Sequence, residues 1–294
     1  MDSQRILNVD VDGSIAKFKS MLSEFDLKPK NIIFKGKGLE FEGYRNFSPD
    51  DDADNIDWKA SSRSQKLLVK KFKEERNLGI MFLVDVGSNM VFGSTEKIKC
   101  EFATETIAAF ADLLISSDDR VGFFLFSDNI TYLNNPKIGN RQFHFFMDVL
   151  SNGLNYGGKT NLDQAIDFAT NYLDSSIFAV IIVSDFLNIT EATKEKLGFL
   201  ANRFKTMAIQ VRDPLDITLP ETEGEIVLED PSTSRQVIIN PRITKNAYEK
   251  YVFEQEKIMK SVFEKSGVAY LSLITNKSFA PPLAIFLEQQ MGKF

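Results

Sequence analysis

The feature that most constrains this fold is a regular alternation of apolar runs with helix-like segments, which continues from residue 79 to the C-terminus. The runs at 79–84 and 178–183 are continuously apolar, as in strands that are covered on both faces. The segment 143–150 instead repeats apolar residues at i, i+3, i+4 and i+7, the spacing of an amphipathic helix. This alternation predicts a doubly wound, mostly parallel α/β sheet with helices on both faces.

The remaining segments follow the same scheme. Further strands are expected over 121–126, 130–133, 207–211 and 268–273, and helices over 14–25, 94–116, 161–173, 190–204, 248–266 and from about 281. Ser94 is the expected cap of the first long helix, and Gly267 is expected to end the last long one in the left-handed conformation. Two short runs, 225–228 and 236–239, predict a hairpin inserted into the alternation.

The chain changes character near Glu75, where a charged, Asp-rich stretch ends and the alternation begins. We therefore expect two parts. Residues 1–77 would form a small N-terminal α+β segment with a helix and the Asp-rich stretch, and residues 78–294 would form the sheet domain.

Composition excludes several kinds of site. The 294 residues carry 35 basic and 41 acidic side chains, a net charge of -6, which argues against a nucleic-acid-binding protein. A single cysteine and a single histidine exclude a disulfide framework and metal sites built from several such ligands. No apolar run of about 18 residues and no secretory signal is apparent, so we expect a cytoplasmic protein without an integral membrane segment. Its chemistry must come from carboxylates, hydroxyls, amides and lysines.

Three polar residues are expected at the carboxyl edge of the sheet, where α/β proteins bind their ligands. Asp85 and Asp185 end two apolar strands, and Thr160 follows a glycine turn. Two carboxylates about 4 Å apart would repel by about 4 kcal/mol at an effective dielectric constant of about 20. A proton, a lysine or a divalent cation must relieve that repulsion, and oxygen ligands of this kind suit Mg²⁺.

This set resembles the metal-ion-dependent adhesion site of von Willebrand factor A domains, which has an Asp-x-Ser-x-Ser loop, a threonine after a glycine turn and a strand-end aspartate. Asp85, Thr160 and Asp185 match by position, whereas Gly87 and Asn89 stand where that family has serines. The resemblance implies a degenerate site in which Asp85, Asn89, Thr160 and Asp185 bind Mg²⁺ weakly or not at all. The alternative is that these are strand-end turn residues that hold no metal.

A second resemblance lies upstream of the sheet. Residues 41–52 read Phe-Glu-Gly-Tyr-Arg-Asn-Phe-Ser-Pro-Asp-Asp-Asp, and Ile-Asp-Trp-Lys follows at 56–59. They resemble the signature of a prokaryotic family known as domain of unknown function 58, roughly Arg-x-Tyr-x-Pro-Gly-Asp-Asp-x-Arg-x-Ile-Asp-Trp. Phe47, Asp50 and Asp54 depart from that pattern. Asp119-Arg120-Val121-Gly122 also fits, so the resemblance covers about residues 34–290.

The second resemblance implies a von Willebrand A-like domain and a class of partner. Members of that family are often encoded with MoxR-type AAA+ ATPases and are thought to act with them in chaperone-like maturation of protein complexes. A MoxR-type ATPase is therefore the expected partner of this chain.

The Asp-rich signature has two physical interpretations. Ser48 can cap a short helix that has Pro49 at its first position, in a salt-bridged turn that docks on the sheet domain with Trp58 as its buried anchor. Alternatively, Asp51 and Asp52 belong to an acidic surface that binds a partner.

We expect a non-enzymatic protein-interaction module, in which Ser88 and Lys159 join the strand-end residues in binding the partner. One alternative is an Mg²⁺-dependent phosphohydrolase that uses the strand-end aspartates. Another is a scaffold without metal. Residues 153–160 also match the P-loop pattern Gly-x4-Gly-Lys-Thr, but a P-loop must follow a strand, and the segment before residue 153 has helical spacing.

Overall fold

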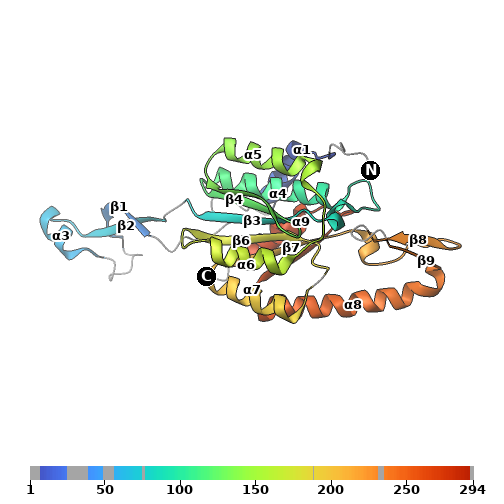
Figure 1. Cartoon of the computed structure of the whole chain (residues 1–294). Coiled ribbons are helices and arrows are strands. Elements are labelled where there is room, and N and C mark those ends of the chain that lie inside the picture. The colour runs from blue at the N-terminus through green and yellow to red at the C-terminus, as the bar shows by residue number, and fades with distance from the viewer. Residues whose placement is uncertain are drawn as a thin grey trace.

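The computed structural model describes residues 7–24, 39–48, 56–74, 77–187, 189–230 and 235–291. Its centre is a six-stranded sheet in the order β10-β7-β6-β3-β4-β5 (Figure 1). The strands are β3 (Gly79–Asp85), β4 (Arg120–Phe126), β5 (Ile130–Lys137), β6 (Ile177–Ser184), β7 (Lys205–Arg212) and β10 (Ala269–Ile274). Every pairing is parallel except that of the edge strand β5 with β4. The predicted doubly wound, mostly parallel fold is confirmed.

Helices cover both faces of this sheet in two layers. One layer consists of α1 (Val11–Glu24), α4 (Lys99–Ser116), α5 (Asn140–Ser151) and α9 (Ala280–Met291). The other consists of α6 (Leu162–Tyr172), α7 (Glu191–Arg203) and α8 (Pro241–Lys265), which Figure 1 shows below the sheet. The strands read as continuous apolar runs because both of their faces are buried.

The strand order reverses between β3 and β6, and this reversal positions the strand-end residues. The chain runs from β3 outward through β4 and β5 and then returns to the other side of β3 as β6. Val84 near the end of β3 pairs with Val183 near the end of β6. Asp85 and Asp185 therefore follow neighbouring strands at the topological switch point, the usual place for a ligand site in such sheets.

The predicted cap of the first long helix is wrong. Helix α4 begins at Lys99, and the side chain of Glu101 accepts a hydrogen bond from the backbone N–H of Ile98 at 3.1 Å. Ser94 instead gives both its N–H and its hydroxyl to the carboxylate of Asp213. By contrast, Gly267 lies just after α8 with φ of +70°, as expected for a left-handed C-cap.

Helix α1 packs on the sheet domain although it lies far upstream of it in sequence. Phe18 and Leu22 are almost fully buried, in the same core as α4, α5 and α9. The side chains of Glu101 and Glu105 accept hydrogen bonds from the N–H groups of Asn8 and Asp10, so α4 also holds the segment that leads into α1. The boundary at residue 77 stays a prediction, but α1 shares the core of the larger part.

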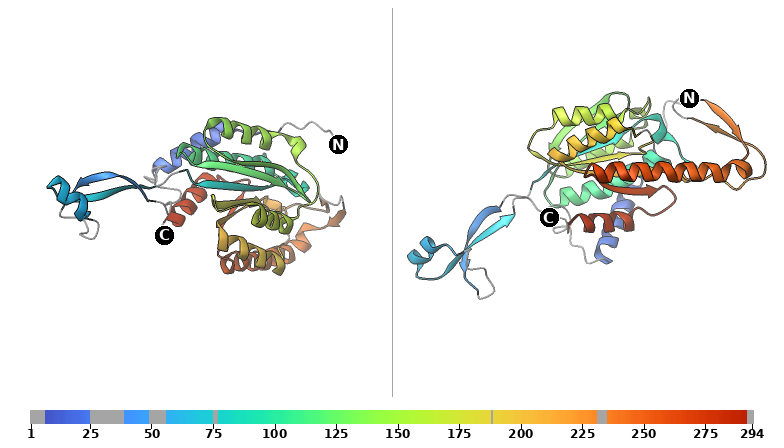
Figure 2. Two further views of the ribbon diagram at one scale, coloured as in Figure 1. Left: turned by 60° about the vertical axis from the view of Figure 1, so that its left-hand side comes forward. Right: turned by 90° about the horizontal axis from the view of Figure 1, so that it is seen from below.

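A small two-stranded arm separates α1 from the sheet in sequence. Strand β1 (Leu39–Asn46) pairs antiparallel with β2 (Leu68–Glu74), and the short helix α3 (Trp58–Ser64) lies between them. Figures 1 and 2 show β1, β2 and α3 extending away from the sheet domain. No helix in the described ranges is both long and apolar enough to cross a bilayer.

The expectation that Trp58 is a buried anchor is wrong, because 67% of its surface is exposed. It begins α3, at a distance from the sheet domain against which it was expected to pack (Figure 2). Polar contacts hold this turn instead: Asp57 caps α3 by accepting the N–H groups of Lys59 and Ala60, and it also accepts the Tyr44 hydroxyl. The predicted helix beginning at Pro49, with Asp51 and Asp52, lies outside the described residues.

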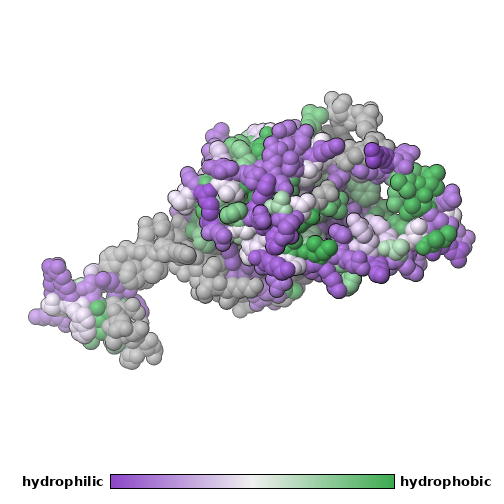
Figure 3. All heavy atoms as spheres, turned by 60° about the horizontal axis from the view of Figure 1, so that its bottom comes forward, coloured by the Kyte–Doolittle hydropathy of each residue, from purple (hydrophilic) through white to green (hydrophobic). Residues whose placement is uncertain are grey.

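The predicted inserted hairpin is confirmed as β8 (Ile226–Glu229) and β9 (Gln236–Ile239), which precede α8. Its apolar side chains Val227, Val237 and Ile238 are more than half exposed. Figure 3 shows apolar residues gathered at the end of the molecule where this hairpin lies.

The packing of α1 predicts that it contributes to the stability of the whole sheet domain. We expect Phe18→Ala to lower the free energy of unfolding by about 3–5 kcal/mol, since it leaves a cavity in the core. The exposed neighbour Lys17 provides a matched control, because Lys17→Ala removes a side chain from the same helix without opening a cavity. Urea denaturation followed by circular dichroism would measure both. Equal midpoints for the two variants would contradict the shared core.

Candidate functional site

Asp85 is fully buried and accepts three hydrogen bonds at the end of β3. Its Oδ1 accepts the N–H of Gly87 at 2.9 Å and the hydroxyl of Thr160 at 2.8 Å. Its Oδ2 accepts the hydroxyl of Ser184, the last residue of β6, at 2.6 Å. The carboxylate therefore ties together the β3 loop, the β6 end and the loop before α6.

Gly87 is what allows Thr160 to approach Asp85 so closely. A Cβ atom at residue 87 would lie 2.1 Å from the Thr160 Oγ1 and 3.1 Å from the Asp85 Oδ1, too close for an ordinary side chain. A serine in this place, as the resembling site pattern has it, would have to displace the threonine hydroxyl. The direct bond between Asp85 and Thr160 and a hydroxyl at residue 87 exclude each other in this arrangement.

Asp185 is neutralised by a buried lysine that the sequence analysis did not identify. The Lys99 ammonium lies 2.9 Å from the Asp185 Oδ2 and 3.2 Å from the Asp216 Oδ2. The side chains of Lys99 and Asp185 are 1% and 3% exposed. Burial lowers the pKa of Lys99, but the negative charges of Asp185 and Asp216 outweigh burial and raise the pKa above its usual value. The lysine therefore stays charged, and we call Lys99, Asp185 and Asp216 the Lys99 cluster.

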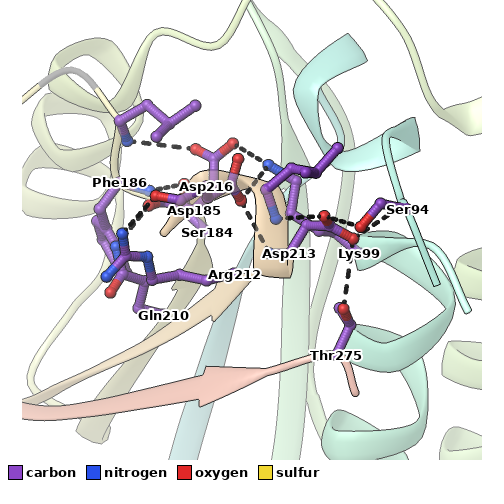
Figure 4. Close-up of polar contacts among 12 residues, drawn as sticks. Ser94, Lys99, Ser184, Asp185, Phe186, Gln210, Arg212, Asp213, Asp216 and Thr275 are labelled. Atoms are coloured by element: carbon purple, nitrogen blue, oxygen red, sulfur yellow. Dashed lines mark hydrogen bonds and ion pairs between the residues drawn. The ribbon is translucent and has the colours of Figure 1, made fainter. Parts of the chain in front are cut away.

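Hydrogen bonds connect the Lys99 cluster to the loops around it (Figure 4). The Asp216 Oδ2 also accepts the N–H of Asp213 at 2.8 Å, and the Arg212 guanidinium donates to the Asp216 backbone carbonyl at 2.6 Å. Asp213 in turn holds Ser94, with its N–H at 2.7 Å. The loops after β3 and β7 and the first turn of α4 are thus fixed relative to one another.

The residue after Asp185 adopts a strained conformation. Phe186 has φ of +53°, a region that bulky residues rarely adopt. Its ring is buried and packs edge-on against Phe263 of α8 at 5.1 Å, and its N–H donates to the Ser184 hydroxyl at 3.2 Å. The next residue, Leu187, donates its N–H to the Asp185 Oδ1 at 3.3 Å, while 53% of its surface is exposed. The turn therefore buries one apolar side chain and presents the next to solvent.

A pocket of about 180 Å³, which we call the rim pocket, lies at this edge of the sheet. Asn89, Thr160 and Asp185 line it, together with Ser184, Phe186 and Leu187. Three of the four residues predicted as metal ligands thus share one pocket, and Asp85 is hydrogen-bonded to two of its lining side chains, those of Thr160 and Ser184.

The two predicted partner-binding residues near this pocket lie on neighbouring loops. Ser88 is half-buried, and its N–H donates to the Gly158 carbonyl at 2.8 Å. Lys159 is exposed on the glycine turn, where Gly158 has φ of +78°. The segment before Gly153 is the helix α5, so the P-loop interpretation is wrong, because that motif requires a strand there.

The residues present do not fit a magnesium ion. Mg²⁺ requires oxygen ligands in near-octahedral geometry at about 2.0–2.1 Å. Here both oxygens of Asp85 accept hydrogen bonds, the Asp185 Oδ2 faces an ammonium, and Gly87 offers no side chain. Across the described ranges, no group of three or more acidic, histidine or cysteine side chains is placed to hold a metal.

Burial raises the pKa of Asp85 from 3.8 to about 7, and the negative charge of Asp185 adds to this effect. The hydrogen bonds from Ser184, Gly87 and Thr160 act in the opposite direction, because they favour the charged form. Lys99 binds Asp185 and Asp216, whereas within the described ranges Asp85 is compensated by hydrogen bonds alone.

The raised pKa of Asp85 predicts a specific pH dependence of stability. Between about pH 4 and 7 the folded state binds a proton that the unfolded state does not bind, so stability falls as pH rises, by up to about 1.4 kcal/mol per pH unit. Asp85→Asn cannot titrate and should lose this contribution. Urea denaturation of both proteins at several pH values in this range would measure it. A constant difference between the two proteins would contradict the raised pKa.

Comparison with known proteins gives relatives of similar length. An uncharacterized protein of Mycobacterium tuberculosis is 24% identical over 259 residues, covering 87% of this chain and 80% of the relative. A protein of Mycobacterium bovis matches equally well.

Similar solved structures include BatB, a conserved hypothetical protein from Bacteroides thetaiotaomicron, and the SpRpn10 VWA domain. BatB has a TM-score of 0.49 and 15% identity, covering 73% of this chain and 98% of BatB. The SpRpn10 domain has a TM-score of 0.44 and 11% identity, covering 69% of this chain and 92% of the domain. The sequence also matches one family description, "Protein of unknown function DUF58", over residues 43–258, which is most of the chain. The chain therefore belongs to the DUF58 family.

Proposed function

We propose that this protein is a non-enzymatic interaction module that binds a protein partner at the carboxyl edge of its sheet. The observation that carries this proposal is the turn at Phe186 and Leu187, where a strained backbone holds an apolar side chain in solvent beside the rim pocket. Strain of this kind costs of order 1–3 kcal/mol and persists at sites where it serves a function.

The proposed binding surface continues from the rim pocket onto α8. A second pocket of about 280 Å³ lies between the same turn and α8, and Leu187 borders both pockets. Tyr251 and Ile258 line the second pocket and are more than half exposed. Exposed aromatic and aliphatic side chains next to polar groups are typical of the central part of a protein interface.

The burial of the strand-end carboxylates supports binding rather than catalysis. A phosphohydrolase would need Asp85 or Asp185 in contact with its substrate or metal, yet these residues are 0% and 2% exposed. Asp185 is also bound to Lys99. We therefore expect the purified protein to release no more phosphate from p-nitrophenyl phosphate than its Asp85→Asn variant does. Turnover that this substitution abolishes would establish the phosphohydrolase alternative instead.

A MoxR-type AAA+ ATPase is the partner that we propose, acting in chaperone-like maturation of protein complexes in the cytoplasm. The support for this partner is the membership of the DUF58 family together with the association that the sequence resemblance implied. The acidic residues Asp51 and Asp52 stay candidates for a second contact with that partner, as do Ser88 and Lys159.

Leu187 provides the direct test of the proposed surface. Because its side chain is exposed, Leu187→Ser should leave the melting temperature unchanged while reducing affinity for the ATPase roughly 10-fold or more. Phe199→Ser, on α7, removes a side chain that is 65% exposed and lies outside both pockets. It is the matched control. Surface plasmon resonance with the purified ATPase would measure both variants, and equal affinities would refute the proposed surface.

A chelator separates this proposal from metal-dependent adhesion. Because the site residues do not fit Mg²⁺, we expect capture of the ATPase by the immobilised protein to be equal with EDTA and with Mg²⁺, when no nucleotide is present. Loss of capture in EDTA alone would favour the metal-dependent interpretation of Asp85, Asn89, Thr160 and Asp185. Unchanged capture by Asp185→Ala would instead favour a scaffold that does not use this rim.

A further inference from the structure

We propose that the Lys99 ammonium is the resident cation of the strand-end site, performing inside the protein the charge neutralisation for which a divalent ion would otherwise be required. The inference concerns the interior of the site and does not depend on which partner binds its rim. It explains how the buried Asp185 and the half-buried Asp216, on neighbouring loops, are compatible with a folded protein.

The geometry of the Lys99 cluster is that of a cation bound by oxygen ligands. The ammonium has Asp185 on one side at 2.9 Å and Asp216 on the other at 3.2 Å, and its side chain is 1% exposed. The two carboxylates come from loops after β6 and β7, at the same sheet edge as Asp85. Nothing but the lysine bridges these two carboxylates among the contacts of the described residues.

The position of Lys99 in α4 disfavours a positive charge on its side chain. It is the first residue of α4, where the partial positive charge of the helix N-terminus repels an ammonium. The neighbours Ile98 and Cys100 are buried. A lysine ammonium without acidic partners would be more stable in solvent. The burial of Lys99 therefore depends on the two carboxylates that bind it.

The Lys99 cluster is also connected to the exposed turn, because the two carboxylate oxygens of Asp185 make different contacts. Its Oδ2 binds Lys99, and its Oδ1 accepts the N–H of Leu187 at 3.3 Å. Its backbone carbonyl accepts the Gln210 side chain at 2.8 Å. The internal cation therefore fixes the carboxylate that orients the exposed turn (Figure 4).

An internal cation and an ordinary buried ion pair differ in what happens when the lysine is removed. Loss of an ordinary pair only destabilises the protein. Loss of a resident cation leaves a cavity between carboxylates that a divalent cation can enter, so the protein should acquire a dependence on metal that it did not have.

Thermal unfolding of the full chain with and without millimolar Mg²⁺ tests this difference. We expect wild type to show no change with Mg²⁺. Lys99→Ala should melt roughly 5–10 °C lower in EDTA and recover part of that loss in Mg²⁺. Lys99→Met fills most of the volume without charge, so it should be destabilised and should not recover. A rise in the melting temperature of wild type with Mg²⁺, or a Lys99→Ala variant that Mg²⁺ does not stabilise, would overturn the proposal.

A second pair of variants keeps the test decisive if Lys99→Ala does not fold. Adding Asp185→Asn to Lys99→Met removes the more deeply buried of the two uncompensated charges, so the double variant should melt higher than Lys99→Met alone. A double variant that melts no higher would also overturn the proposal. Lys196→Met is the matched control, because Lys196 forms a partly exposed pair with Asp167 at 2.6 Å. It should change the melting temperature by at most about 2 °C and should not respond to Mg²⁺.

Discussion

The pairing of β3 with β6 at the centre of the sheet is the constraint on which the rest of the site depends. Because these parallel strands lie side by side and end together, the residues that follow them meet at one edge. Two of those residues are aspartates with almost no exposure, and a buried carboxylate without compensation is costly. The hydroxyls around Asp85 and the ammonium beside Asp185 are the two compensations that the fold supplies.

The sequence predicted those parts that depend on local pattern. The apolar runs at β3 and β6 predicted central strands, because both faces of a central parallel strand are buried. Gly267 predicted the end of α8, since glycine adopts the left-handed conformation at little cost. Asp85, Thr160 and Asp185 were placed at one edge because the switch point follows from strand order, and they do meet there.

The sequence did not predict contacts between segments that are far apart along the chain. Lys99 and Asp185 are separated by 86 positions, and Ser94 and Asp213 by 119. A serine before a helix is a favourable N-cap. Ser94 does not cap α4, because its N–H and hydroxyl donate to the distant carboxylate of Asp213. One local signal for Lys99 did exist, because a lysine in the first turn of an apolar helix opposes the helix dipole and needs an acidic partner. The prediction that Trp58 is buried failed for a related reason. A tryptophan is usually buried, but here it lies on an arm away from the core.

The internal compensation has a consequence for how a partner would be recognised. The Lys99 charge is shielded from solvent and is already shared between two carboxylates, so it is not available to attract a carboxylate of a partner. The rim instead offers hydroxyl and amide groups, the acidic residue Asp163 and the exposed apolar side chain of Leu187 around one pocket. Recognition at such a surface relies on shape and apolar contact, for which a fixed backbone is an advantage because little conformational entropy is lost on binding. The strained turn at Phe186, held by its ring against Phe263, supplies that rigidity where the exposed side chain needs it.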